Sequence, residues 1–163
     1  MAEGEFALMQ QHLEAALELG TSAGADAGWD HETYAMLADG AAQQRDPVRL
    51  QKYAPLAEEC ARRVDHKLHL AIAQRAWGVA HTLAGEYPRA EVCFKQALEY
   101  FTAYPAPWQV GRTLLELGEL ARLQLEPDQA RGYISRALSA FEEMRAAPYA
   151  ARARAALENI SRD

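Results

Sequence analysis

The sequence predicts an all-α fold built from antiparallel helix hairpins, and three observations carry this prediction. Apolar residues recur at helical spacing along the chain, and no segment alternates as a strand does. The chain is 50% hydrophobic but only 9% aromatic, because alanine supplies much of the apolar content. Alanine-rich helices can pack at close range. The chain also matches itself after a shift of forty residues, which is typical of a repeat array.

The chain divides into an N-terminal segment, residues 1–29, and an array, residues 30–163. The first segment begins with an amphipathic helix at residues 5–19. It ends with a hinge at residues 20–29, GTSAGADAGW, because glycine and small polar residues sustain a helix poorly. Breaks are short from Asp30 onward, and together the two segments give about eight helices. Prolines mark the starts of several of them: Pro47, Pro88, Pro107, Pro127 and Pro148.

The internal repeat is clearest over residues 71–141. Glycine on the first helix of a hairpin, and alanine on the second, mark the points where two helix axes approach to about 8 Å. A glycine inside a helix costs about 1 kcal/mol relative to alanine, so its recurrence indicates a packing benefit. The pairs that match at the forty-residue shift are Gly78 and Gly118, Ala90 and Ala130, Ala97 and Ala137, and Phe101 and Phe141.

These residues resemble the pattern of tetratricopeptide repeat (TPR) proteins, W-x2-L-G-x2-Y, then A-x3-F, then A. The resemblance weakens over residues 31–66, which keep the register without the glycine or the aromatic residue. The pattern is present as Gln74, Trp77, Gly78, His81, Ala90, Phe94 and Ala97, and again as Leu114, Leu117, Gly118, Ala121, Ala130, Ile134 and Ala137.

The period of forty residues, rather than thirty-four, is similar to the longer-helix repeats of large bacterial regulators of the LuxR and MalT kind. The resemblance implies a TPR-like α-solenoid, a right-handed superhelix of antiparallel hairpins. It implies about three repeats followed by a capping helix at residues 148–160.

Charge and cysteine content exclude several classes of function. The net charge of -6 offers no overall attraction to nucleic acid or to anionic membranes. Two isolated cysteines indicate a reducing compartment, and neither a signal peptide nor a membrane-spanning run is present, so we expect a cytoplasmic protein. Residues 1–60 carry three basic and eleven acidic side chains, whereas the remainder has a balance of +2, an asymmetry that suits oriented docking.

No motif predicts an enzyme, a cofactor or a metal site. The segment DHETYA begins like a zinc-protease helix, but Ala35 stands where the second histidine would be. We interpret His66 and His69, three residues apart beside Asp65, as solvated surface. The glycines of residues 20–28 lack the lysine of a phosphate-binding loop. His81 and Cys93 fall in the repeat register, which favours packing over a catalytic pair.

The predicted function is binding of a protein or peptide partner. In the family that the sequence resembles, first helices line a concave face that holds a peptide. Arginines at such positions suit an acidic partner, because guanidinium groups bind carboxylates bidentately. The alternative is a solvated face with intramolecular ion pairs. The positions on this face are Ile72, Arg75, Val79, Thr82, Arg112, Leu115, Glu119, Arg122 and Arg152.

A second hypothesis is a self-assembling homo-oligomer. The acidic N-terminal helix would then pack on the more basic array of a neighbouring chain, or fold back into the groove of its own chain.

Overall fold

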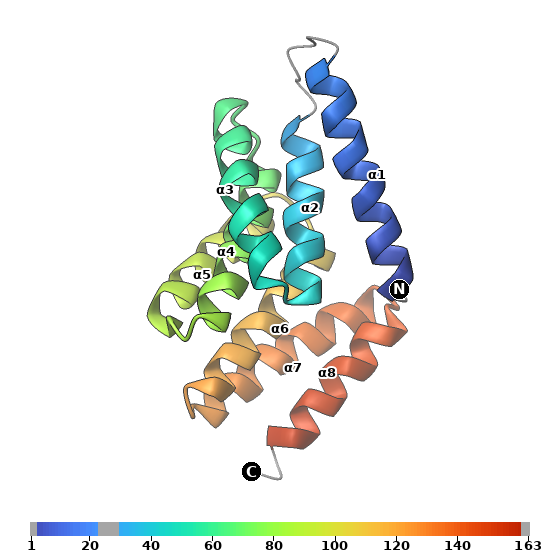
Figure 1. Ribbon diagram of the computed structural model, residues 1–163. Coiled ribbons are helices and arrows are strands. Elements are labelled where there is room, and N and C mark those ends of the chain that lie inside the picture. Colours follow the sequence, from blue (N-terminus) through green and yellow to red (C-terminus); the bar gives the residue numbers. More distant parts are fainter. Residues whose placement is uncertain (1–2, 23–29, 161–163) are drawn as a thin grey trace. The chain divides into compact units, whose positions relative to one another are not determined.

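The computed structural model describes residues 3–22 and 30–160, and within these ranges it is entirely α-helical (Figure 1). Eight helices pack as sequential antiparallel pairs, so the predicted fold class, a TPR-like arrangement of hairpins, is confirmed. The helices are α1 (Glu3–Ser22), α2 (Asp30–Gln44), α3 (Pro47–Arg63), α4 (Lys67–Leu83), α5 (Tyr87–Ala103), α6 (Pro107–Leu123), α7 (Pro127–Glu143) and α8 (Ala147–Ile160).

The turns that connect α2 through α8 recur every twenty residues and share one backbone hydrogen bond. The turn positions are 45, 65, 85, 105, 125 and 145. The backbone N–H of the residue that follows each of them donates to the carbonyl five residues before that donor; His66 N and Ala61 O, for example, are 2.8 Å apart. This bond closes the helix end as in a Schellman motif. Position 105 differs because it is a proline, which cannot adopt a positive φ. The turn residues with positive φ are Arg45 (51°), Asp65 (52°), Gly85 (75°), Leu125 (62°) and Arg145 (56°).

These turns give a first testable prediction. Arg145 is exposed and has a φ of 56°, a conformation that costs a residue with a Cβ atom about 1 kcal/mol. Arg145→Gly should therefore raise the free energy of unfolding by about 0.5 kcal/mol, after the larger entropy loss of glycine is subtracted. Urea denaturation measures this change. Arg136→Gly is the control, because Arg136 is exposed and lies inside α7. This substitution should lower the free energy of unfolding by about 1 kcal/mol, so equal effects at both positions would contradict the prediction.

The chain separates into two compact units, residues Met1–Ala80 and His81–Asp163. In the first unit, α1 packs on α2, and α2 packs on α3. The hydroxyl of Tyr53 on α3 donates to Glu14 of α1, and Lys52 Nζ lies 3.8 Å from the same carboxylate. The predicted N-terminal helix thus exists and extends to Ser22, because one glycine does not end a helix. The rest of the predicted hinge, residues 23–29, lies outside the described residues.

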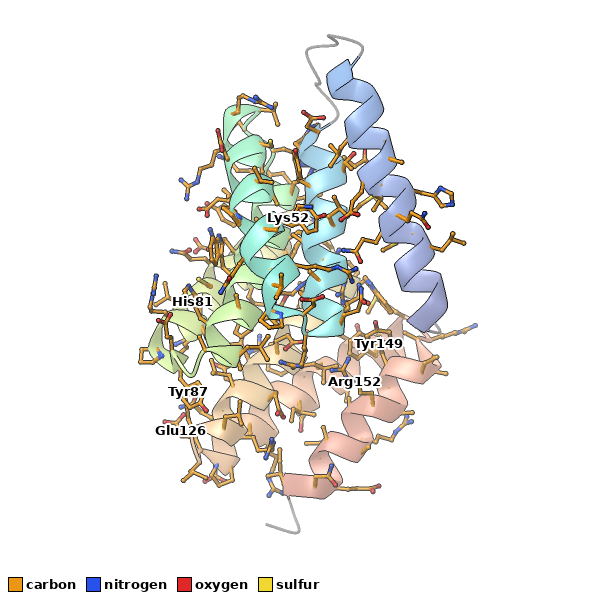
Figure 2. The ribbon with its side chains drawn as sticks, in the orientation of Figure 1. Lys52, His81, Tyr87, Glu126, Tyr149 and Arg152 are labelled. Carbon is orange, nitrogen blue, oxygen red and sulfur yellow. The ribbon has the colours of Figure 1, made fainter. Side chains whose placement is uncertain are left out.

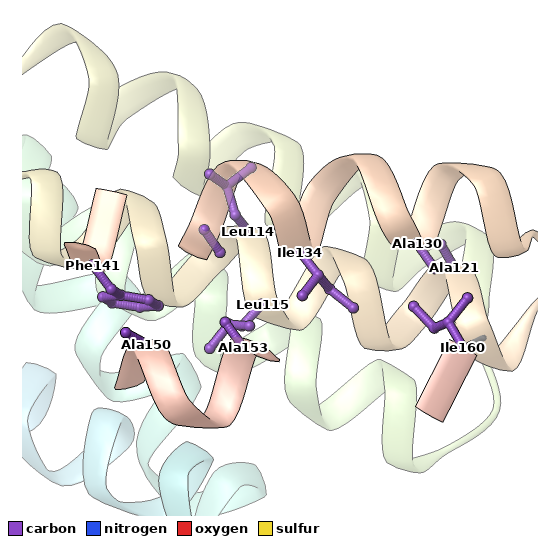
Figure 3. Close-up of a cluster of buried hydrophobic side chains, with 10 residues drawn as sticks. Leu114, Leu115, Ala121, Ala130, Ile134, Phe141, Ala150, Ala153 and Ile160 are labelled. Carbon is purple, nitrogen blue, oxygen red and sulfur yellow. The ribbon is translucent and has the colours of Figure 1, made fainter. Parts of the chain in front are cut away.

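The second unit buries the residues that the forty-residue repeat selected (Figure 3). A Cβ atom built on Gly118 of α6 would lie 2.4 Å from Ile134 Cγ1 of α7, so only glycine fits this crossing. The equivalent residues of α3, α5 and α7 are all 3% exposed or less, so the helical register of the repeat corresponds to the buried face of each helix. These residues are Leu50, Ala54, Ala57 and Ala61; Ala90, Phe94, Ala97 and Phe101; and Ala130, Ile134, Ala137 and Phe141.

Candidate functional site

The predicted binding positions on α4 lie mostly inside the protein. Arg75 is 2% exposed, and its Nη2 atom lies 2.7 Å from Oδ1 of Asp39 on α2. Val79 and Thr82 are buried, whereas Ile72 is half-buried. Arg75 therefore holds α4 to α2 in the first unit. The helical register predicted that these side chains of α4 line an accessible face, but most of them are buried.

The positions on α6 and α8 form a more accessible set, which we call the arginine face: Arg112, Glu119, Arg122 and Arg152. Arg122 and Arg152 are exposed, and the other two are half-buried. Arg122 donates two hydrogen bonds to Glu119, from Nε at 3.0 Å and from Nη2 at 2.8 Å. Arg152 lies on α8, one turn beyond Tyr149 (Figure 2). Leu115 is 7% exposed and belongs to the core beneath this face.

An apolar recess opens at one end of the arginine face. It has a volume of about 350 Å³, and Arg122, Leu125, Pro127 and Ile160 line it. Leu125 is 88% exposed because it occupies the turn between α6 and α7. The recess combines an apolar lining with one cationic side chain. This combination suits a ligand that carries an apolar side chain next to a carboxylate.

His31 lies beside His66 and His69 in the first unit, a proximity that the sequence did not predict. His31 begins α2, and His66 and His69 lie at the start of α4. One candidate ligand atom from each lies within 4.8 Å of the others. The ring centroids are 5.2 Å apart for His31 and His66, 4.9 Å for His31 and His69, and 3.9 Å for His66 and His69.

The surroundings of Cys60, His81 and His69 determine how reactive these three side chains are. Burial raises the pKa of the Cys60 thiol, which disfavours the reactive thiolate. His81 Nδ1 lies 2.6 Å from Glu86 Oε2, so a carboxylate of the α4–α5 turn binds this ring. Burial, followed by the charges of His66 and His31, lowers the pKa of His69 to about 4, so that this ring is neutral at pH 7.

Comparison with known proteins identifies the fold. The crystal structure of BtubC (BKLC) from P. vanneervenii is similar to this chain, with a TM-score of 0.56 and 16% sequence identity. The similarity covers 98% of this chain and 89% of BtubC. No model of a protein family matches the sequence, and no curated protein is significantly similar to it. Among the described helices, none is long and apolar enough to cross a bilayer. The chain thus has a helical, repeat-like fold that is similar to the fold of BtubC.

Proposed function

We propose that this protein is a non-enzymatic interaction module that binds an acidic peptide segment of a partner protein on its arginine face. The TPR-like fold supports a role in protein interaction, because stacked hairpins of this kind present extended binding surfaces. The forty-residue period is similar to that of the longer-helix arrays of the LuxR and MalT kind, which also supports a repeat architecture. The observation that carries the proposal is the apolar recess beside Arg122, on the unit that also exposes Arg152.

The spacing of these groups defines the ligand. Arg152 and Ile160 are eight residues apart on α8, a rise of about 12 Å along the helix. An extended peptide covers that distance with about four residues. A segment with an apolar side chain in the recess can therefore place a carboxylate near each of Arg122 and Arg152.

The existing ion pair on this face does not prevent such binding. Arg122 and Glu119 have side-chain exposures of 42% and 39%, and an exposed pair of this kind contributes about 0–1 kcal/mol. An incoming carboxylate can replace Glu119 at little cost. Arg152 forms no hydrogen bond or ion pair with the side chains that the structure describes.

Charge reversal tests the proposal. A purified chain is probed with an array of short peptides of varied composition, and the bound peptides should be enriched in Asp or Glu beside an apolar residue. Arg122→Glu with Arg152→Glu should weaken binding of these peptides by about tenfold or more, equivalent to about 1.4 kcal/mol. Fluorescence anisotropy with the selected peptides measures the loss.

The matched control is Arg131→Glu with Arg136→Glu, which makes the same change of charge on the exposed side of α7. This control should bind the selected peptides like the unmodified chain. Equal weakening by the two double variants would show a non-specific charge effect, and an array with no bound peptide would reject the proposal.

A further inference from the structure

The three-histidine cluster in the first unit has the composition of a metal site. His31, His66 and His69 present ligand atoms that all lie within 4.8 Å of one another. They come from two different places, the start of α2 and the junction of α3 with α4. Three imidazoles from two segments of the chain make a donor set that Zn²⁺ accepts, with a fourth position for water.

Two buried ring nitrogens of this cluster lack hydrogen-bond partners. Nδ1 of His31 and Nδ1 of His69 are shielded from solvent, and neither has a partner among the described residues. Buried polar atoms are nearly always satisfied, so each such atom calls for an explanation, and an absent ion is one. A metal ion would accept the lone pairs of both nitrogens at once.

The geometry is close to what coordination requires. Tetrahedral Zn²⁺ with bonds of about 2.0–2.1 Å places its ligand nitrogens about 3.3 Å apart. The present separations, up to 4.8 Å, need a small inward movement of the rings. The torsion that turns a histidine ring has a broad energy minimum, so this adjustment needs no change of backbone.

One ring nitrogen of His66 is already in a hydrogen bond. Its Nδ1 accepts a hydrogen bond from the backbone N–H of His69 at 3.2 Å. To bind a metal through Nδ1, the ring must turn and exchange this long hydrogen bond for a metal bond. The exchange is local, because His66 immediately precedes α4 and the His69 N–H lies in the first turn of that helix.

The surrounding charges favour a cation. Asp30 and Glu32 flank His31 in the first turn of α2, and the Glu32 carboxylate interacts electrostatically with His69. Asp65 lies beside His66 and forms an ion pair with Lys67.

We propose that His31, His66 and His69 bind one Zn²⁺ ion, which clamps the beginning of α2 to the α3–α4 turn. Such an ion ties together segments thirty-five residues apart in the sequence. It binds the folded chain in preference to the unfolded one, and therefore stabilises the fold by mass action. This site is separate in kind from the arginine face, because its donors are imidazoles and its ligand is a cation.

Binding of Zn²⁺ to the full, untagged chain tests the proposal. Equilibrium dialysis should find one ion per chain at pH 7.5, and saturating Zn²⁺ should raise the thermal unfolding midpoint. His31→Gln, His66→Asn and His69→Gln should each weaken binding by about tenfold or more, and the triple variant should lose it. The asparagine at position 66 keeps the capping role of that side chain at the start of α4.

Two control variants and a spectrum make the result specific. His12→Gln changes an exposed histidine of α1, and His81→Gln changes the histidine that pairs with Glu86; both should bind Zn²⁺ like the unmodified chain. Co²⁺ should give visible absorption without a thiolate charge-transfer band, which distinguishes the histidines from Cys60. Circular dichroism verifies that each variant is folded. Absence of stoichiometric binding, unchanged binding by the folded triple variant, or a thiolate band would overturn the proposal.

Discussion

Gly118→Val is expected to lower the free energy of unfolding by about 3 kcal/mol, because the crossing of α6 and α7 has no room for a side chain. A Cβ atom at this position would lie 2.4 Å from Ile134 Cγ1, 3.0 Å from Ile134 Cδ1 and 3.4 Å from the Ala130 carbonyl oxygen. Cγ1 is close to the backbone of Ile134, so rotation of the end of that side chain does not relieve the contact. Urea denaturation of the two proteins measures the difference.

Gly132 provides the matched control for this prediction. It lies on α7, and a Cβ atom built there would meet nothing within 4 Å. Gly132→Ala should stabilise the protein by about 0.5–1 kcal/mol, because alanine is the better helix former. Gly118→Ala should instead destabilise it by about 1–2 kcal/mol. The same substitution at two helical glycines thus has opposite signs, and a stabilising Gly118→Ala would contradict the close crossing.

A second substitution tests whether contact with Ile134 causes the loss of stability in the Gly118 variants. Removing its side chain with Ile134→Ala costs about 2–5 kcal/mol in the unmodified protein. In the Gly118→Ala background the same change also removes the overlap, so its cost should fall by at least about 1 kcal/mol. Additive effects of the two substitutions would place the strain elsewhere.

The sequence predicted the hairpins well because their closest contacts depend on residues with little or no side chain. Gly118 and the alanines of α7 can be recognised because they recur at the forty-residue shift, whereas Gly132 corresponds to Val92 and does not recur. The turns were harder to predict. Among the residues that the structure describes, four of the five with positive φ, including Leu125 and Arg145, are not glycine, so nothing in their chemistry marks the left-handed conformation. The twenty-residue period becomes visible only when the backbone angles are known.

The candidate sites show a similar limit. Helical spacing places Arg75 and Arg122 on related faces of two helices, but it does not say how deeply each is covered. Arg75 is buried against α2, whereas Arg122 is exposed. The histidine cluster was missed for another reason. His31 meets His66 and His69 only because consecutive helices run antiparallel in one particular register, and a shift of a single turn would separate them.

Removal of one partner from the ion pair between Asp39 and Arg75 is expected to cost more stability than removal of one partner from an exposed pair such as Arg122 and Glu119. The paired atoms of Asp39 and Arg75 lie 2.7 Å apart, and the side-chain exposures are 18% and 2%. Asp39 also accepts a hydrogen bond from Gln43, at 3.0 Å, which fixes the carboxylate. Asp39→Ala should therefore lower the free energy of unfolding by about 3 kcal/mol, because it removes the carboxylate from a guanidinium that remains in the interior.

Arg122→Ala is the matched comparison, since it removes an arginine from the exposed pair with Glu119. It should cost less than about 1 kcal/mol. The double variant Asp39→Ala with Arg75→Met replaces the buried pair with apolar groups and should recover most of the stability that Asp39→Ala loses. Equal costs for Asp39→Ala and Arg122→Ala in urea denaturation would mean that Arg75 is solvated. Arg75 would then be accessible to a binding partner. The large loss of stability that we expect instead gives Arg75 a structural role, in which it holds α4 on α2.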